Sequence, residues 1–398
     1  MAPARTAQHL VHLPNGRLRV TVQRADWDLH RLCAFAARNN PRRGFLFVSK
    51  VLGKHWPSLP SEMQAAHQAL ADKLPAAREP ALFLGLAETA TGLAQGVFEA
   101  YLARHGPGSA VYVQTTRYPL SGARTLDFEE WHSHAQNLSL HLPDRADLQA
   151  AFLRARLLVL VDDELSTGAT FAALIAAHAQ VNPDVERACL VSLTNFMGEA
   201  ARQRFRQDAA CAQVDFVSLL DGGFEFERDP HFEAAPPAVA QAALGCRRGF
   251  VGDYSARLGT DVALQLPPAL IDSLIDSLSH SPADAAGARL PTAAPVLVLG
   301  MGEFMHPAFC LARALALRGV PVRVQSTTRS PILTGADIRC RIELPDPYGE
   351  AIPNYLYNVD PADQGAVLLC GETPPSPALT ETLRRLSAQW VPLRHRAP

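Results

Sequence analysis

The segment LVLVDDELSTGAT, Leu158 to Thr170, limits the fold and the chemistry of this chain more than any other stretch. Four apolar residues precede two acids, and a loop of small residues then leads into the helical pattern ATFAALIAAHAQ. Such a strand, loop and helix predicts one unit of a parallel α/β sheet. Asp162 and Asp163 would then lie at the carboxyl end of a strand, where open α/β sheets bind ligands.

The loop after the two acids has the features of a phosphate site. Gly168 lets the backbone approach a ligand closely, and the helix N-terminus attracts anions through its dipole and its N–H groups. Hydroxyl groups of Ser166, Thr167 and Thr170 add donors. The two acids can accept hydrogen bonds from sugar hydroxyls and offset positive charge on a sugar ring. The segment therefore predicts a ribose phosphate site.

Alternating strand and helix patterns predict two α/β domains. From residue 81, apolar runs such as ALFLGLA and SAVYVQTT alternate with amphipathic stretches, which favours a parallel sheet covered by helices on both faces. A chain of 398 residues exceeds the usual size of a single core. We expect a first domain over residues 1–228, a connector over 229–292 and a second domain over 293–398. The second domain is expected to close with AVLLCGE as a strand and PALTETLRRLSAQW as a terminal helix.

The second domain repeats the order of elements found in the first. A strand, a Gly-x-x-Glu turn, a helix, a strand and Thr-Thr-Arg recur in FLGLAETATGLAQGVFEAYLARHG with VYVQTTRYPL and in LVLGMGEFMHPAFCLARALALRG with VRVQSTTRSPI. Further on, VLVDDELSTG aligns with VLLCGETPPS, which pairs Glu164 with Glu372. The second domain thus looks like a degenerate copy without the acidic pair. Convergence of two ordinary βαβ units is the alternative.

Composition argues for a globular protein without a polyanionic partner. Hydrophobic residues make up 48% of the chain and charged residues 19%, and the formal net charge is −2. Such a charge supplies no positive field for nucleic acid. No segment approaches the roughly 20 consecutive apolar residues that span a bilayer. We therefore expect a cytoplasmic protein that binds neither membrane nor nucleic acid.

The segment VLVDDELSTGAT resembles the phosphoribosyl pyrophosphate (PRPP) signature of type I phosphoribosyltransferases, in which the acids hold ribose and the loop holds the 5′-phosphate. More narrowly, the chain is similar to the phosphoribosyltransferase plus TRSP-domain proteins associated with tellurite-resistance gene clusters. The blocks that carry this resemblance are FLFVSKVLGKHWP, LAETATGL, HSHA, STTRSPI and YGEAIPNYLYNV. It implies a type I phosphoribosyltransferase-like parallel sheet with flanking helices, a PRPP-binding domain over residues 1–228 and a TRSP-type domain over 293–398.

The resemblance and the strand positions together define the candidate residues. The catalytic candidates are Asp162, Asp163, Glu88, Arg117, His132 and His134. The PRPP-binding candidates are Asp162, Asp163, Glu164, Ser166, Thr167, Gly168, Ala169, Thr170, Ala87, Thr89, Ala90, Lys50 and Lys54. The second-domain candidates are Gly300, Gly302, Glu303, Thr327, Thr328, Arg329 and Ser330. Asp162 and Asp163 are also candidate contacts for Mg²⁺, directly or through substrate.

Each candidate also has a simpler structural interpretation. Arg117 is expected to clamp pyrophosphate, with a surface ion pair as the alternative. Residues 118–142 are expected to form a mobile loop that closes over PRPP, with a solvated polar loop as the alternative. That loop contains Glu129, Glu130, His132, His134 and His141. The basic residues Arg247, Arg248 and Arg257 of the connector receive only a weak phosphate role.

The predicted function is a Mg²⁺-dependent phosphoribosyltransferase that transfers 5-phosphoribosyl from PRPP to a nucleobase-like acceptor, or catalyses the reverse pyrophosphorolysis. The resemblance implies a nucleoside-like metabolite pathway linked to tellurite or stress resistance. A non-catalytic sensor of PRPP or a nucleotide is one alternative, and a second domain that docks pathway partners is another. The acceptor and the oligomeric state stay open, with a homodimer as one alternative.

Overall fold

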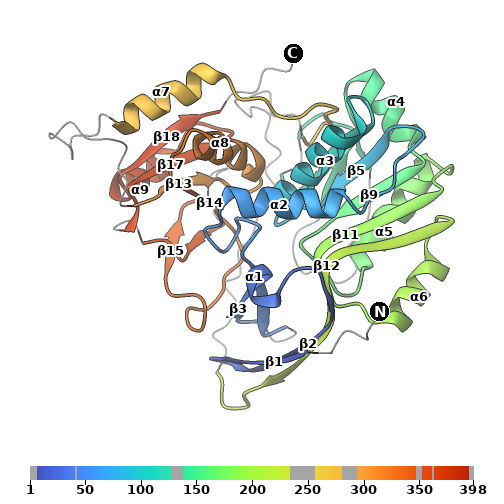
Figure 1. Ribbon diagram of the computed structural model, residues 1–398, viewed down its shortest axis with the longest axis horizontal. Helices are drawn as coiled ribbons and strands as arrows, with labels where there is room; N and C mark the ends of the chain where they lie inside the picture. The colour runs from blue at the N-terminus through green and yellow to red at the C-terminus, as the bar shows by residue number, and fades with distance from the viewer. Residues whose placement is uncertain are drawn as a thin grey trace.

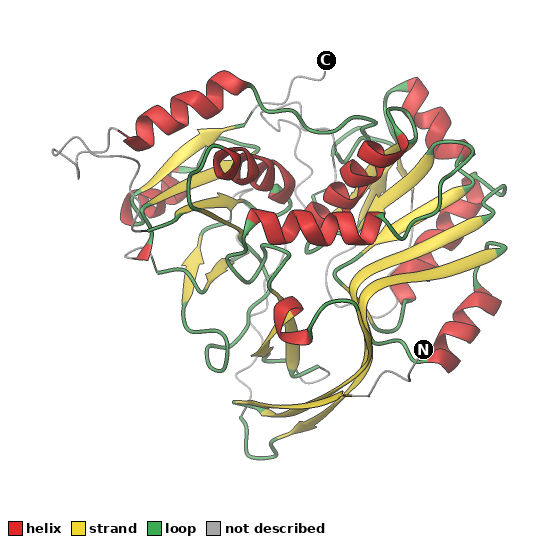
Figure 2. Ribbon diagram, in the orientation of Figure 1, coloured by secondary structure: helices red, strands yellow, loops and turns green. Residues whose placement is uncertain are grey.

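The computed structural model describes residues 7–40, 43–118, 120–126, 138–233, 256–279, 294–346, 352–360 and 363–393. Two α/β lobes lie side by side, with α2, α3 and α8 between their sheets (Figures 1 and 2). We call residues 7–233 lobe 1 and residues 294–393 lobe 2. Within the described ranges, no helix combines the length and the apolar character needed to cross a membrane.

The helices and strands alternate along most of the chain. The helices are α1 (Leu29–Leu32), α2 (Pro60–Ala71), α3 (Thr91–His105), α4 (Ala146–Arg154), α5 (Ala169–Val181), α6 (Glu199–Asp208), α7 (Pro268–Ser279), α8 (Met305–Leu317) and α9 (Pro377–Arg385). The strands of lobe 1 are β1 (Ala7–Leu13), β2 (Gly16–Ala25), β3 (Cys33–Ala37), β4 (Phe45–Ser49), β5 (Ala81–Gly85), β6 (Ala110–Thr116), β7 (Thr125–Leu126), β8 (Ser139–His141), β9 (Leu157–Val161), β10 (Glu164–Leu165), β11 (Arg187–Asn195) and β12 (Gln213–Arg228). The strands of lobe 2 are β13 (Val296–Gly300), β14 (Val322–Ser326), β15 (Arg341–Leu344), β16 (Asn354–Tyr357), β17 (Ala366–Gly371) and β18 (Ala388–Pro392).

The sheet of lobe 1 has a parallel centre, as the apolar strand patterns predict. Its order is β1-β2-β12-β11-β9-β5-β6-β8-β7, and the strands from β12 to β6 run parallel. Every residue of β5, β6 and β9 is buried. Strands covered on both faces lose water from all their side chains, which explains their continuous apolar sequences. The expected α/β fold with a parallel sheet is confirmed.

An N-terminal hairpin extends this sheet beyond the elements expected from sequence. Strands β1 and β2 pair with each other, and β2 pairs antiparallel with the long strand β12. The alternating pattern GRLRVTV buries Leu18 and Val20 and leaves their neighbours more exposed. One face of the hairpin therefore packs on the core.

Lobe 2 has the same strand order as the centre of lobe 1. Its sheet runs β14-β13-β17-β18, which corresponds to β6-β5-β9-β11. Each lobe also has an antiparallel strand pair at the same place in the chain. In lobe 1, β7 and β8 lie between β6 and β9, and in lobe 2, β15 and β16 lie between β14 and β17. The internal repeat seen in the sequence is therefore also a repeat of topology.

The strand register corrects one detail of the sequence alignment. The Leu86 N–H donates to the Val161 carbonyl in lobe 1, and the Met301 N–H donates to the Cys370 carbonyl in lobe 2. Val161 therefore corresponds to Cys370, and the gap-free alignment is displaced by one residue. The residue two positions after each is Asp163 in lobe 1 and Glu372 in lobe 2. Lobe 2 thus keeps one acid at the strand end.

The end of the chain also differs from the sequence interpretation. The stretch expected as one terminal helix divides into α9, which ends at Arg385, and the strand β18. Strand β18 pairs in parallel with β17 along its length. The unpaired edge of β17 supplies hydrogen-bond partners that a longer helix would leave unsatisfied. Tertiary pairing therefore decides the state of residues 388–392.

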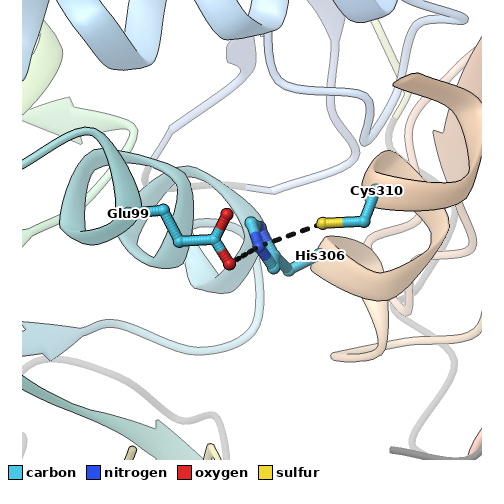
Figure 3. Close-up of side chains that lie close together, drawn as sticks. All are labelled: Glu99, His306 and Cys310. Carbon is cyan, nitrogen blue, oxygen red and sulfur yellow. Dashed lines mark hydrogen bonds and ion pairs between the residues drawn. The ribbon is translucent and has the colours of Figure 1, made fainter. Parts of the chain in front are cut away.

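A buried polar triad joins the two lobes where α3 packs against α8. Figure 3 shows Glu99 of α3 pointing toward His306 and Cys310, which lie one turn apart on α8. His306 Nε2 lies 2.8 Å from Glu99 Oε1 and 3.3 Å from Cys310 Sγ. Burial opposes protonation, but Cys310 and Glu99 raise the pKa of His306 from an ordinary 6.5 to about 10. The triad therefore acts as a buried ion pair at neutral pH.

The same three side chains are a possible metal ligand set, because their donor atoms lie within 4.8 Å of one another. Histidines that bind metals almost always donate their other ring N–H to a partner. His306 Nδ1 is buried and has no hydrogen-bond partner among the described residues. The arrangement is therefore better explained as a hydrogen-bonded link between the helices.

We predict that the contribution of His306 to stability falls as pH rises. A raised folded pKa means that this contribution is complete below pH 6.5 and is lost as pH approaches about 10. The difference in melting temperature between the unmodified protein and His306→Gln should therefore shrink from pH 6.5 to 10. His231→Gln provides the control, since it removes an exposed histidine that takes no part in this ion pair. A constant difference for His306→Gln would contradict the ion pair.

Candidate functional site

Three neighbouring strands of lobe 1 bring the candidate residues to one edge of the sheet. Gly85, the last residue of β5, lies opposite Gln114 of β6 and Val161 of β9. Parallel strands end on the same side, so the segments that follow these residues emerge together. Glu88, Arg117 and the acidic pair therefore share this edge. The resemblance to phosphoribosyltransferases, together with the strand positions, places these residues in one candidate site.

The acidic pair is half-buried directly after β9. The Asp163 N–H donates to Asp162 Oδ1 over 2.9 Å, and the Asp163 carbonyl accepts from the Leu193 N–H of β11. Burial, together with the neighbouring Asp163 carboxylate, raises the pKa of Asp162 well above its usual range. Burial also raises the pKa of Asp163 to about 6, and the nearby Glu164 acts in the same direction. Near neutral pH, the pair thus carries about one negative charge.

Glu164, the third acid of the segment, pairs with an arginine that sequence reasoning missed. Arg43 Nη2 donates to both oxygens of Glu164, over 2.8 and 2.7 Å, and its guanidinium lies over the Phe45 ring. Arg43 precedes β4, which forms a separate hairpin with β3. The basic NNPRRGF turn before an apolar strand was the available signal. Glu164 therefore helps to hold this hairpin over the loop.

The loop reaches the helix α5 through a left-handed residue. Gly168 has φ +76° and precedes α5 as its N-cap, and the Ala169 N–H in the first turn donates to Thr167 Oγ1 over 3.4 Å. A Cβ at this position would lie 2.8 Å from Met197 Cε and 2.9 Å from Phe205 Cε2. Ser166, Ala169 and Thr170 are half-buried around this turn, and Thr167 is exposed. The turn before α5 therefore consists of small and hydroxyl-bearing residues that are partly accessible to solvent.

The turn after β5 brings a paired carboxylate to the same edge. The Ala87 N–H donates to Thr115 Oγ1 over 2.8 Å, and the peptide bond between Ala87 and Glu88 is cis. Glu88 is buried and lies 2.5 Å from Lys54 Nζ. Although burial opposes ionisation, the Lys54 ammonium holds the pKa of Glu88 below its usual range. Glu88 therefore stays ionised and is neutralised by its partner, while Thr89 is half-buried and Ala90 is buried in the same turn.

The two lysine candidates have structural partners. Lys54 is buried, and besides Glu88 it meets the Gly302 carbonyl of lobe 2 over 2.9 Å. Lys50 donates to the His30 carbonyl over 2.9 Å, and its ammonium lies 5.3 Å from the Trp56 ring centre. Lys54 thus links the turns of the two lobes.

The candidates of lobe 2 lie against the end of β6. The Glu303 carboxylate accepts from the Arg117 N–H over 2.8 Å and from the Thr116 hydroxyl over 2.7 Å. The Arg329 guanidinium lies 4.5 Å from the ring centre of Tyr118, the residue after Arg117. The two sets of candidates therefore meet at the interface between the lobes.

Internal hydrogen bonds order the remaining candidate residues of lobe 2, which line the crevice between the ends of β13 and β14. The Gly302 N–H donates to Thr327 Oγ1 over 3.0 Å, and the Ser330 N–H donates to Thr328 Oγ1 over 3.1 Å. Gly300 lies close to the first turn of α8, since a Cβ there would be 2.4 Å from the Phe304 carbonyl oxygen.

The loop candidates His132, His134, Glu129 and Glu130 lie outside the described residues, as do Arg247 and Arg248. His141 is described and buried, and its Nε2 accepts from the Leu120 N–H over 3.0 Å. Burial lowers the pKa of His141. This histidine therefore orders the start of the loop rather than facing solvent.

Arg257 is the connector residue whose environment differs most from the sequence expectation. A scattered basic residue in a loop suggested a weak phosphate contact, yet Arg257 is 1% exposed. Its guanidinium forms ion pairs with Glu303 and Glu372, at 2.8 and 2.6 Å. No local pattern marks this residue, because both partners lie far along the chain.

Comparison with known proteins supplies two family matches. Residues 32–223 match the model of a family described as "Phosphoribosyl transferase". Residues 258–386 match a family described as "TRSP domain C terminus to PRTase_2". No curated protein sequence matches the chain. The two matches cover most of both lobes, and the TRSP match begins at the residue after Arg257.

Several solved structures are similar to part of the chain. The adenine phosphoribosyltransferase from Thermoanaerobacter pseudethanolicus is 20% identical, with 49% of this chain and 99% of that chain covered and a TM-score of 0.32. The Giardia lamblia enzyme complexed with 9-deazaadenine is 16% identical, with 50% and 98% covered and a TM-score of 0.33. From the two family matches, the chain carries a phosphoribosyl transferase-family domain over residues 32–223, followed by a TRSP domain over residues 258–386.

Proposed function

We propose that the protein transfers 5-phosphoribosyl from PRPP to a nucleobase-like acceptor, or catalyses the reverse pyrophosphorolysis. The observation that supports this most is the acidic pair, which is followed directly by the Gly168 loop at the N-terminus of α5. Both lie inside the range that matches the phosphoribosyl transferase family. Following the family resemblance, the proposal includes a cytoplasmic, nucleoside-like metabolite pathway linked to tellurite or stress resistance.

The acids would act on the ribose. In the forward reaction, the bond from the anomeric carbon to pyrophosphate breaks, a bond to an acceptor nitrogen forms, and the acceptor nitrogen passes its proton to the departing pyrophosphate or to solvent. Positive charge develops on the ring between these events. The Asp163 carboxylate would stabilise this charge and accept a hydrogen bond from a ribose hydroxyl. Because Asp162 has the higher pKa, it would hold a proton and donate it to substrate oxygen.

The 5′-phosphate and the pyrophosphate would occupy different parts of the edge. The Gly168 loop offers backbone N–H groups and hydroxyls to the 5′-phosphate. Arg117 would bind the pyrophosphate as it gains charge on leaving. Glu88 would otherwise repel this group, but its ion pair with Lys54 cancels its charge. This pairing removes the main electrostatic objection to a glutamate in this turn.

The site also fits a Mg²⁺ ion that enters with substrate. Mg²⁺ prefers oxygen ligands and usually takes several of them from phosphate and water. The oxygens of Asp162 and Asp163 suit this role, and the described residues place no third side-chain ligand close to them. When bound, Mg²⁺ would neutralise charge on the diphosphate.

Replacing Gly168 with alanine should weaken both the fold and PRPP binding. Its left-handed backbone costs an alanine about 1–2 kcal/mol, and the new methyl group would meet Met197. The check is chemical denaturation together with calorimetric titration of PRPP. Gly198→Ala is the matched control, because Gly198 has φ −65° and open space around its Cβ. Equal behaviour of the two variants would argue against a strained loop.

Removing one charge from the acidic pair should impair catalysis. We expect Asp163→Asn to lower kcat/KM on the order of 10²–10³-fold, as for loss of one preorganised electrostatic group. Pyrophosphate release across a panel of nucleobases measures this effect. Asp208→Asn, at the exposed end of α6, serves as the control. Turnover like that of the unmodified protein would refute the role, and PRPP binding without pyrophosphate release from any base would favour the sensor alternative.

The pH dependence of catalysis should follow the same carboxylate. Protonation of Asp163, whose pKa is about 6, removes the charge that the transition state needs. The kcat/KM value reports the free enzyme, so it should fall as pH drops below about 6. Asp163→Asn should lack this acid limb. A flat profile for the unmodified protein through this range would contradict the assignment.

A further inference from the structure

A segment of lobe 1 runs along the edge strand β14 of lobe 2, and a segment of the connector runs along β6 of lobe 1. Gly53 of lobe 1 accepts from the Ser326 N–H of β14 over 2.7 Å, and Ser58 pairs with Val324 of the same strand. Ala256 of the connector accepts from the Gln114 N–H of β6 over 3.0 Å, and Thr260 pairs with Tyr112. The two segments therefore contact their strands in the same way.

These matching contacts place Lys54 and Arg257 at corresponding positions of the repeat. The register relates Gln114 to Ser326, since each lies opposite the last glycine of the neighbouring strand. The residue after Gly53 is Lys54, and the residue after Ala256 is Arg257. Lys54 meets the turn glutamate of lobe 1, and Arg257 meets that of lobe 2. The repeat therefore includes a cation and a glutamate that sequence comparison does not align.

Arg257 fills the crevice that the repeat would otherwise leave open in lobe 2. Its Nη1 and Nη2 donate to Glu372 over 2.6 and 2.9 Å, while Nη2 and Nε donate to Glu303 over 2.8 and 3.0 Å. Glu303 corresponds to Glu88, and Glu372 corresponds to Asp163. The guanidinium thus lies between the lobe 2 counterparts of the two residues that flank the ribose site proposed for lobe 1. A second PRPP molecule would have to displace this buried cation.

The filled crevice also contacts the first site directly. Glu303 accepts from the Thr116 hydroxyl and from the Arg117 N–H, and Arg257 Nε donates to Thr116 Oγ1 over 2.9 Å. The Tyr118 ring lies 5.9 Å from the Arg257 guanidinium. The three residues that begin with Thr116 are therefore held from the lobe 2 side. Arg117 is the proposed pyrophosphate ligand among them.

We propose that Arg257 and Glu303 are positioning residues that set the backbone of Arg117, so that lobe 2 completes the site of lobe 1 and binds no PRPP itself. This inference rests on the proposed function for its catalytic consequence. The physical reason is burial: Glu303 is fully buried, and Arg257 supplies the partner that a buried carboxylate requires. A paired, rigid carboxylate directs Arg117 more tightly than a solvated one.

The test compares Glu303→Gln with Glu372→Gln. Both remove one carboxylate from the Arg257 ion pair, and in the described part of the chain it is Glu303 that accepts from the Thr116 hydroxyl and the Arg117 N–H. In Glu303→Gln, the amide group faces a donor and one of these bonds is lost. We expect KM for PRPP to rise about 10- to 100-fold, the usual loss for a charged hydrogen bond, with a smaller change in kcat. Glu372→Gln should raise KM much less.

A second measurement separates positioning from catalysis. Hydrogen exchange of the Arg117 amide should accelerate in Glu303→Gln and stay slow in Glu372→Gln, whether or not PRPP binds. Arg257→Lys should raise KM for PRPP less than Arg257→Met does, because lysine keeps the charge with fewer donors. Equal KM and equal exchange in the two glutamine variants would overturn the inference.

Calorimetry of the unmodified protein should give one PRPP per chain. Two PRPP per chain would overturn the inference that Arg257 keeps PRPP out of lobe 2. Absence of any PRPP binding would instead refute the proposed function and leave the exchange result to decide the positioning role.

Discussion

Buried ion pairs at the lobe interface hold the two turns on which the candidate site depends. Lys54 pairs with Glu88 and reaches the Gly302 carbonyl, while Arg257 pairs with Glu303. Charges removed from water are costly unless they are paired and hydrogen-bonded. Separation of the lobes would break the contact of Lys54 with Gly302 and the contacts of Glu303 with Thr116 and Arg117. The interface is therefore a condition for the geometry of the site as well as for the fold.

The acidic pair shows how the same burial sets chemistry. Burial raises the pKa of both carboxylates, and the neighbouring charge of Asp163 adds to the rise for Asp162. The turn glutamate nearby is buried more deeply, yet its pKa is lowered because Lys54 lies beside it. One edge of the sheet thus combines a nearly neutral turn with a pair that shares a proton. That combination suits a substrate that is anionic at both ends and becomes cationic in the middle.

The two lobes illustrate how one topology can serve two purposes. Lobe 1 keeps the acidic pair and the Gly168 loop, whereas lobe 2 keeps a single acid and binds an internal guanidinium. In lobe 2, α9 begins with Ser376 as its side-chain cap, so the helix N-terminus already has a partner. The copy has therefore exchanged ligand contacts for contacts within the chain.

Local sequence determined the parallel strands, the helix after the acidic pair and the positions of Glu88, Arg117 and Asp163 after three of those strands. These features depend on apolar periodicity, which neighbouring residues encode. Only the tertiary structure decided the partners of Arg257, the role of Arg43, the strand state of residues 388–392 and the register that pairs Asp163 with Glu372. Each of these depends on contacts between segments far apart in the chain, for which local patterns carry no signal.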